Sequence, residues 1–312
     1  MAPDISSHTR VERATARRTA HGAMIRAGAV VVLGALALTA CASPAPAEEA
    51  GESVIAGLEY WSDADDALLL DACLPPKQET PSPAIVLLHG GGFVDGDRIG
   101  GGMRPLCGQM SARGVAAFSI DYRLAPDHRY PSQVEDAQRA IEWLRAPEQV
   151  ERFGIDPARI GVFGSSAGAI IAQSVGMAGS GPTDVGTRVS AVVSLSGVSL
   201  MTEEALSLGE PTPEAIELVL NYLGCTSASA VDCPQAEPAS PLGQVDPSDP
   251  PTMLVTGAQE FVPVEQAERM HEALVAAGVQ SELVVVDGSG HGVQLLRNDV
   301  RAAVVEFFAT HL

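Results

Sequence analysis

The sequence has few aromatic residues and few basic ones. Aromatic side chains make up 4% of the 312 residues, and 19 Lys and Arg stand against 39 Asp and Glu, a formal net charge of -20 at pH 7. An acidic chain repels nucleic acid and anionic membrane surfaces, so both are excluded as binding partners. The scarcity of aromatic rings leaves an aliphatic core. Because no internal repeat divides the chain, one domain around one sheet is expected.

The N-terminal region lacks an apolar run long enough to span a membrane. Residues 27–38 are apolar, but this run of about a dozen residues is short of the ~20 that a spanning helix needs. The run follows five arginines and ends at Leu38-Thr39-Ala40-Cys41, which resembles a bacterial lipoprotein signal. In such a signal, small residues allow cleavage before the cysteine, and the thiol takes the lipid. Residues 1–40 are therefore predicted to be a signal peptide and Cys41 the lipidation site, with a transmembrane anchor as the alternative.

The segment at 41–53 is rich in Pro and Ala and has no periodicity, which is typical of a tether. Removal of residues 1–40 would take away five basic and two acidic residues, leaving 14 Lys and Arg, 37 Asp and Glu and a net charge of -23. We expect an exported, acidic domain that a lipid anchor alone holds on the outer face of the bacterial cell membrane. Met24 begins a shorter signal of the same kind and is predicted to be the true start of translation.

Cysteine is scarce, with five in the chain. Beyond Cys41 four remain, and an even number outside the cytoplasm permits disulfides. Cys225 and Cys233 flank a short polar loop that a bridge closes with little strain, so this disulfide is predicted. Cys73 and Cys107 fall on an expected strand and an expected helix, where buried free thiols fit equally well. No Cys and His spacing resembles a zinc site.

From about residue 54, short runs rich in Val and Ile alternate with longer amphipathic stretches. This pattern is typical of an α/β protein in which helices cover a parallel sheet. Strands are expected at 68–74, 84–88, 115–120, 160–163, 191–195, 252–256 and 283–286, and helices at 133–145, 167–177, 263–277 and 294–309. Residues 199–250 interrupt the alternation with Glu- and Pro-rich sequence and one helical piece at 213–223. This insertion is predicted to cap a site at the carboxyl ends of the strands.

Two glycine-rich motifs each follow an expected strand. Gly164-Ser165-Ser166-Ala167-Gly168 separates a strand from a helix, as in the nucleophile elbow that lifts a serine hydroxyl out of the backbone. Alone, this motif also fits an ordinary strand-to-helix turn. Upstream, His89-Gly90-Gly91-Gly92 ends the strand at 84–88, and its amides can turn toward one point, as an oxyanion requires. The two motifs in this order are typical of α/β-hydrolases.

A third segment extends the likeness to known families. Residues 121–131 read DYRLAPDHRYP and are followed by Glu135-Asp136-Ala137 and Trp143-Leu144. This is similar to the hormone-sensitive-lipase-like and feruloyl-esterase-like (BD-FAE) carboxylesterases, and the likeness covers nearly all of residues 54–312. The hormone-sensitive-lipase branch usually has Asp before the nucleophile. Ser165 stands there, which is closer to the BD-FAE branch.

The resemblance implies an α/β-hydrolase fold with a mostly parallel central sheet flanked by helices and a cap insertion at about 199–250. It implies Ser166 as the nucleophile. The oxyanion donors it implies are the amides of Gly91, Gly92 and Ala167. Residues 54–312 would form the catalytic domain.

A serine needs a neighbouring base, because its hydroxyl is a poor nucleophile at neutral pH. His291 follows the last expected strand on a loop between Gly290 and Gly292, and it is predicted to be this base. His89 belongs to the glycine turn, where a histidine more often supports the loop. His128 is expected to anchor its own loop, as in the family.

The acid is where the chain departs from the family pattern. The pattern has a glycine, two residues, an aspartate, a short spacer and Val-Pro. Here Glu260 takes the aspartate's place, and the spacer before Val262 is one residue short. Glu serves as the acid in some hydrolases, so Glu260 is expected to orient His291. Asp287, four residues before His291, is the alternative.

Together these features predict a serine carboxylic-ester hydrolase that works through an acyl-enzyme on small or medium esters, such as acetyl or feruloyl esters. It needs no metal or organic cofactor. A lipase or a serine peptidase of the same fold stays open, although a cap rich in glutamate, with Tyr222 as its one aromatic residue, suits lipid poorly. A non-catalytic surface binding protein also stays open because of the altered acid. No oligomeric state is predicted.

Overall fold

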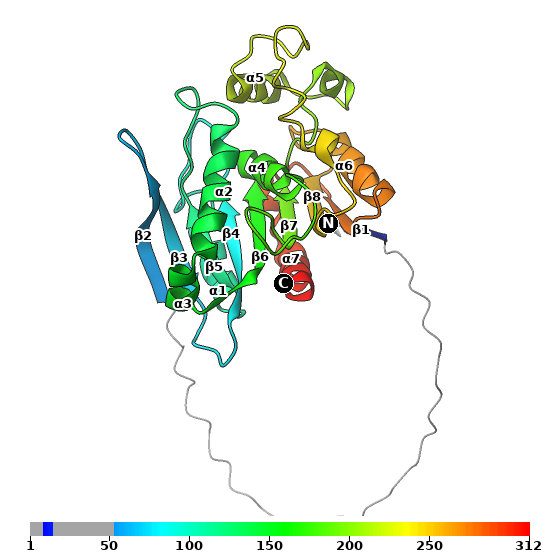
Figure 1. Cartoon of the computed structure of the whole chain (residues 1–312). Helices are drawn as coiled ribbons and strands as arrows, with labels where there is room; N and C mark the ends of the chain where they lie inside the picture. Colours follow the sequence, from blue (N-terminus) through cyan, green and yellow to red (C-terminus); the bar gives the residue numbers. More distant parts are fainter. Residues whose placement is uncertain (1–8, 15–52) are drawn as a thin grey trace, which may run out of the picture.

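Residues 9–14 and 53–312, which the computed structural model describes, form a nine-stranded sheet with helices on both faces (Figure 1). The strands are β1 (Thr9–Ala14), β2 (Ser53–Ser62), β3 (Ala67–Leu74), β4 (Ser82–Leu88), β5 (Ala116–Ile120), β6 (Ile155–Ser165), β7 (Ala191–Leu195), β8 (Thr252–Gly257) and β9 (Ser281–Val286). Their order is β1-β9-β8-β7-β6-β4-β5-β3-β2. The six central strands, from β9 to β5, pair in parallel, and the outer strands pair antiparallel. The predicted α/β-hydrolase architecture is confirmed.

Helices bury the sheet from both sides. They are α1 (Met103–Ser111), α2 (Ser132–Arg145), α3 (Pro147–Phe153), α4 (Ala167–Gly176), α5 (Pro213–Leu223), α6 (Val264–Ala276) and α7 (Asn298–His311), with 3-10 segments η1 (Glu203–Ser207), η2 (Pro241–Gln244) and η3 (Gly292–Leu295). Helices α2, α3, α4 and α6 pack on one face, and α1 and α7 on the other. Central strands are apolar throughout because both of their faces are covered. In β4, Val86 and Leu88 enter one core, and Ile85 and Leu87 enter the other.

The structure differs from the expected elements in several places. Strand β1 and helix α3 were not expected, and no range was given for the helix at Cys107, which is α1. The sequence analysis missed β2, because register shifts between Ile55 and Leu58 and between Glu59 and Trp61 break the period-two pattern of its pairing with β3. The single helix expected over 294–309 is divided into η3 and α7. Leu296 leaves the helical conformation between them, with ψ 56. The break allows Leu295 and Leu296 to be buried side by side in the same core.

Two disulfides are present in the described part of the chain. Cys225 and Cys233 are bridged, as predicted, and the bridge closes the loop after α5. Cys73 and Cys107, which the sequence left open, are also bridged, with their Cα atoms 5.6 Å apart. This second bridge ties α1 to β3. The sequence does not reveal it because the two residues are 34 positions apart.

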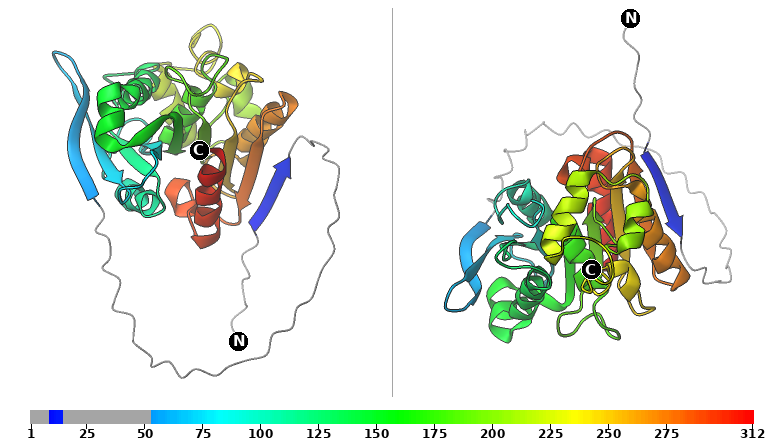
Figure 2. Two further views of the ribbon diagram at one scale, coloured as in Figure 1. Left: turned by 60° about the horizontal axis from the view of Figure 1, so that its bottom comes forward. Right: turned by 90° about the horizontal axis from the view of Figure 1, so that it is seen from above.

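Most of the predicted leader and the tether, including Cys41 and Met24, lie outside the described residues. The exception is β1, which pairs antiparallel with β9 at one edge of the sheet (Figure 2). Cleavage before Cys41 would remove β1 and leave β9 as the edge strand. Within residues 9–14 and 53–312, we find no helix with the length and apolar character that crossing a membrane requires.

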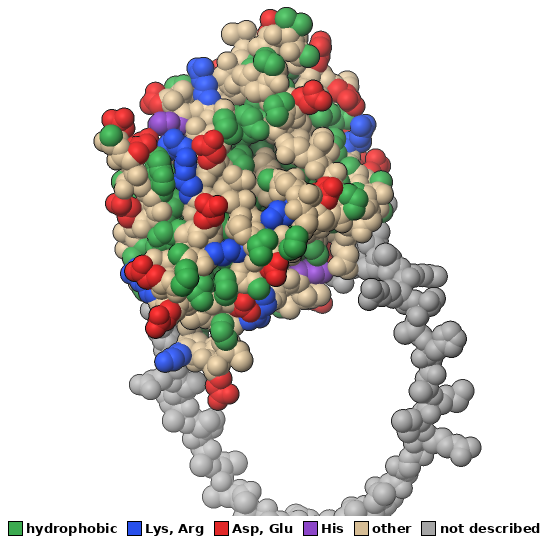
Figure 3. All heavy atoms as spheres, in the orientation of Figure 1, with side chains coloured by type: hydrophobic (Ala, Val, Ile, Leu, Met, Phe, Trp, Pro, Cys, Tyr) green, Lys and Arg blue, Asp and Glu red, His purple; other side chains and the backbone are tan. Residues whose placement is uncertain are grey.

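The predicted cap lies between β7 and β8 and holds η1, α5 and η2. Helix α5 stands at the top of the molecule in Figure 1. The Tyr222 ring of α5 stacks on Phe93, with ring centroids 3.8 Å apart. The predicted glutamates of the cap are exposed, and acidic side chains also spread over the face seen in Figure 3. The contact between Tyr222 and Phe93 holds the cap over the glycine turn that follows β4.

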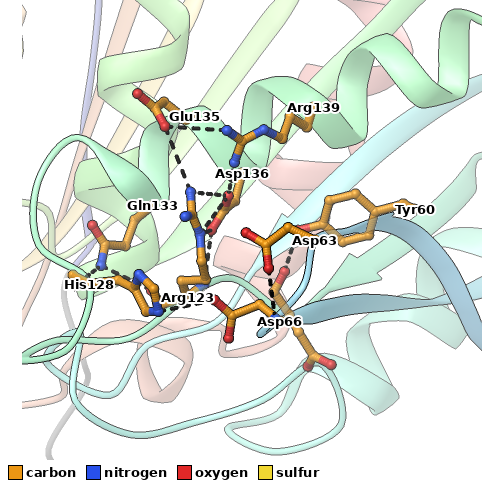
Figure 4. Close-up of polar contacts among 10 residues, drawn as sticks. Tyr60, Asp63, Asp66, Arg123, His128, Gln133, Glu135, Asp136 and Arg139 are labelled. Atoms are coloured by element: carbon orange, nitrogen blue, oxygen red, sulfur yellow. Dashed lines mark hydrogen bonds and ion pairs between the residues drawn. The ribbon is translucent and has the colours of Figure 1, made fainter.

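A buried ion network fixes the segment at 121–131 that carries the family likeness (Figure 4). Asp136 of α2 is fully buried and pairs with Arg123 at 2.8 Å and also with Arg139. Both guanidinium groups lie over the ring of Trp61, at 5.1 and 4.5 Å from its centroid. His128 Nε2 pairs with Asp66 at 3.1 Å, so this histidine anchors its loop, as expected.

Replacement of Asp136 by Asn should strongly destabilise the protein. Two buried or half-buried guanidinium groups would lose their shared counter-charge, and breaking such a pair costs about 3–5 kcal/mol in the free energy of unfolding. The measurement is urea unfolding of the disulfide-intact protein. Glu135→Gln is the matched control, because Glu135 faces the same two arginines with 47% of its side chain exposed. This control should cost less than about 1 kcal/mol. Equal losses in the two variants would contradict the role given to Asp136.

Candidate active site

Ser166 lies in the turn that joins β6 to α4. Its backbone has φ 55 and ψ -119, a strained conformation for a residue with a side chain. The flanking glycines serve another purpose, namely close packing. A Cβ on Gly164 would lie 2.0 Å from the carbonyl oxygen of Gly168, and a Cβ on Gly168 would lie 2.2 Å from that of Leu88. The motif is therefore an elbow in which serine carries the strain, while the glycines let β4, β6 and α4 meet.

A hydrogen-bonded relay leads from Ser166 into the interior. Ser166 Oγ lies 2.7 Å from His291 Nε2, and His291 Nδ1 contacts Glu260 Oε2. A carboxylate can only accept, so the ring proton belongs on Nδ1, which leaves Nε2 free to accept from the serine hydroxyl. The carboxylate that contacts His291 Nδ1 is that of Glu260. The alternative acid, Asp287, is exposed. The three residues that the sequence analysis named thus lie in contact, although they are far apart along the chain.

The Glu260 carboxylate is fully buried and is held at both oxygens. Its Oε1 accepts from Ser196 Oγ at 2.9 Å, from Thr256 Oγ1 at 2.9 Å and from the amide of Gly257 at 2.6 Å. These donors leave Oε2 to His291. The shortened spacer brings the Phe261 ring to 4.3 Å from the imidazole ring. The longer side chain of Glu260 and the shorter loop therefore still bring a carboxylate to the imidazole of His291.

Two serines that the sequence analysis did not assign hold the loop after His291. Ser196, at the end of β7, accepts from the amide of Gly292 at 2.8 Å while its hydroxyl donates to Glu260. Ser165 Oγ accepts from the amide of Val293 at 3.1 Å. In the sequence, the only feature that could have pointed to a role for Ser196 is its position directly after an expected strand. Its role depends on a loop almost a hundred residues away.

The glycine turn lies beside the elbow. Gly91 and Gly92 both have positive φ, 125 and 60, which bends the turn after β4 around Ser166. Its first residue, His89, is buried and stacked on Tyr122, with ring centroids 4.1 Å apart. Tyr122 Oη donates to the His89 carbonyl at 2.7 Å. Burial lowers the pKa of His89, so His89 stays neutral and supports the turn instead of competing with His291.

A pocket of about 320 Å³ opens at Ser166. Gly92 and Ala167 line it together with apolar side chains from α4, α5 and the loop after Glu260. The non-glycine residues with positive φ in the described part are Phe93, Ser166 and Ser196, and all three line this pocket. Backbone strain of this kind gathers at functional sites. Among residues 9–14 and 53–312, no group of three or more His, Cys, Asp or Glu is placed to hold a metal ion.

Replacement of Ser196 by Ala should slow the reaction of Ser166 with a fluorophosphonate. The change removes a donor to the Glu260 carboxylate and the acceptor for Gly292. Hydrogen bonds to charged groups are worth ~1.5–3 kcal/mol, so the labelling rate should fall roughly 10- to 100-fold. Labelling is measured by intact-protein mass spectrometry.

Ser194→Ala is the matched control for Ser196→Ala. Ser194 lies on the same strand and is also buried, but its Oγ accepts from Gln173, away from the relay. Both variants should lower Tm by similar amounts. Only Ser196→Ala should slow labelling, and an equal slowing in both would show that Ser196 acts through stability alone.

Two proteins with known names, an esterase and a deacetylase, are similar to this chain in sequence. LipC, an esterase of Mycobacterium tuberculosis, is 33% identical over 244 residues, covering 74% of this chain and 58% of its own. Arylacetamide deacetylase of Oryctolagus cuniculus is 36% identical over 100 residues, covering 32% of this chain and 25% of its own. The chain thus spans less than two thirds of the length of each of these relatives.

Solved structures match over most of the described domain. Thermogutta terrifontis esterase 2, phosphonylated by sarin, superposes with a TM-score of 0.67 at 26% identity, covering 84% of this chain and 94% of the esterase. A carbohydrate esterase from gut microbiota has a TM-score of 0.68 at 22% identity, covering 85% of this chain and 98% of that one, and supports the fold alone. The BD-FAE family model matches residues 70–274. The chain belongs to the BD-FAE family.

Proposed function

We propose that this protein is a serine carboxylesterase that hydrolyses uncharged esters through an acyl-enzyme. The observation that carries the proposal is the hydrogen-bonded relay from Ser166 through His291 to the buried carboxylate of Glu260. Such a relay activates a hydroxyl nucleophile. The esterase relatives and the family support the same reading.

In the proposed reaction, Ser166 Oγ attacks the ester carbonyl carbon as His291 Nε2 takes the hydroxyl proton. Glu260 stabilises the resulting imidazolium and holds its orientation. The tetrahedral oxyanion accepts hydrogen bonds from the amides of Gly91, Gly92 and Ala167. His291 then returns the proton to the leaving alcohol oxygen. Water attacks the acyl-enzyme by the same route, releasing the carboxylic acid and restoring Ser166.

Several observations support esters with a small acyl group among the substrates, acetyl esters included. The pocket at Ser166 is lined mainly by apolar side chains, which suits an uncharged acyl group. A solved relative, at 25% identity and a TM-score of 0.63, is an acetyl ester-xyloside bifunctional hydrolase from Caldicellulosiruptor lactoaceticus, covering 83% of this chain and 93% of that one. The altered acid position had kept a non-catalytic surface protein open, but the contact of Glu260 with His291 weighs against it.

Turnover of p-nitrophenyl acetate by residues 53–312, together with fluorophosphonate labelling at Ser166, tests the proposal. Ser166→Ala and His291→Ala should reduce turnover to background. Glu260→Gln should lower kcat by a factor of about 10²–10⁴, as for loss of a triad acid. Asp287→Asn is the matched control and should change little.

Two results would contradict the proposal in different ways. Absence of labelling and turnover in folded protein would exclude an esterase and favour the binding protein. Strong loss in Asp287→Asn with little loss in Glu260→Gln would reverse the assignment of the acid.

We also propose that the domain is exported and held at the outer face of the bacterial cell membrane by lipid on Cys41. The motif at 38–41 supports this, although it lies outside the described residues. The disulfides Cys73–Cys107 and Cys225–Cys233 support an oxidising compartment. The bridge that ties α1 to β3 is distant from the catalytic relay in sequence and suits a structural role.

Replacement of Cys41 by Ser should release the protein from the membrane fraction and abolish its labelling by an alkyne fatty acid fed to the cells. One membrane anchor would be lost, and the acidic domain has no attraction for an anionic surface. The control is Cys225→Ser, which breaks the Cys225–Cys233 disulfide without touching the lipidation site. Recovery of peptides from residues 1–40 in the mature membrane-bound protein would contradict the proposal.

A further inference from the structure

A second pocket adjoins the first, between the cap and α6. Apolar side chains line it almost throughout, including Leu200, Met201, Ile216 and Leu220. None of these four lines the pocket at Ser166. The two pockets together therefore offer more apolar lining than an acetyl group can contact.

The two pockets share a wall. Its members are side chains with no polar atom, contributed by the segment after β7, by α5 and by the loop after Glu260: Val198, Ala215, Val219 and Val262. A chain that enters the first pocket from Ser166 meets this wall directly. These side chains make no hydrogen bonds, so no polar side-chain contact separates the two pockets where they adjoin.

The second pocket offers almost nothing for a polar ligand to bind. Its polar side chains are those of Thr202 and Gln266, and Gln266 is 4% exposed. Its Oε1 already accepts from the amides of Ser199 and Leu200, both at 2.9 Å, and its Nε2 donates to the Leu200 carbonyl at 3.3 Å. A sugar or a charged group placed there would lose hydrogen bonds to water without replacement. A hydrocarbon chain fits this chemistry.

We propose that the second pocket receives the distal part of a straight, medium-length acyl chain, an assignment that rests on the proposed esterase function. The leaving alcohol must face His291 Nε2, which returns its proton, and His291 lines neither pocket. Gly92 and Ala167, two of the three proposed oxyanion donors, do line the first pocket, whereas Gly91 does not. The acyl group is the part of the ester that extends from the oxyanion site into the two pockets.

The test compares p-nitrophenyl esters of increasing acyl length on the wild-type domain and two variants. In the wild type, kcat/KM should rise from acetate to hexanoate by up to roughly fourfold per CH₂, as for burial of a methylene group. Ile216→Gln places an amide in the second pocket and should lower the hexanoate-to-acetate ratio of kcat/KM by about tenfold. Glu217→Gln introduces the same side chain at the next position, which is exposed and lines neither pocket, and should leave the ratio unchanged.

A second series holds the acyl group at acetate and lengthens the alcohol from ethyl to hexyl. Ile216→Gln should not change this profile. If it does, the second pocket receives the alcohol and the assignment is overturned. A wild-type preference for acetate over hexanoate, or equal hexanoate-to-acetate ratios in wild type and Ile216→Gln, would also overturn it. Absence of turnover with every ester would instead count against the esterase function itself.

Discussion

The site depends on a place where three backbone segments meet with no side chain between them. A Cβ on Gly168 would lie 2.2 Å from the Leu88 carbonyl oxygen, and one on Gly164 would lie 2.0 Å from the Gly168 carbonyl oxygen. Glycine is required at both positions, because no backbone can yield that far within a packed sheet. This contact brings the end of β4, the end of β6 and the start of α4 together. The glycine turn after β4 and Ser166 are adjacent as a result.

Residues with strained backbone conformations and several hydrogen bonds surround this contact and fix the positions of the neighbouring loops. Phe93, Ser166 and Ser196 all have positive φ and all line the same pocket. Phe93 also contacts the cap, because its ring stacks on that of Tyr222. Ser196 joins the acid to the loop of the base. Residues that line the pocket at Ser166 therefore also hold the cap and the loop of His291 in place.

Sequence reasoning succeeded where the signal is local. The alternation of apolar runs and amphipathic stretches located the central strands and most helices, since strands covered on both faces are apolar throughout. Helix α5 was expected at 213–223, which are its observed bounds. Sequence reasoning failed at β2, where bulges break the period, and at the division between η3 and α7, where burial of Leu295 and Leu296 overrides the helical pattern.

The sequence by itself determined the fold class, the order of the elements and the residues Ser166 and His291, because each depends on a pattern within a few neighbouring positions. Only the tertiary structure decided that Glu260, not Asp287, contacts the imidazole, that Cys73 and Cys107 are bridged, and that Ser196 joins the relay. It alone revealed the second pocket that adjoins the pocket at Ser166. These features depend on distances between segments that are remote in sequence, and packing around the sheet sets those distances.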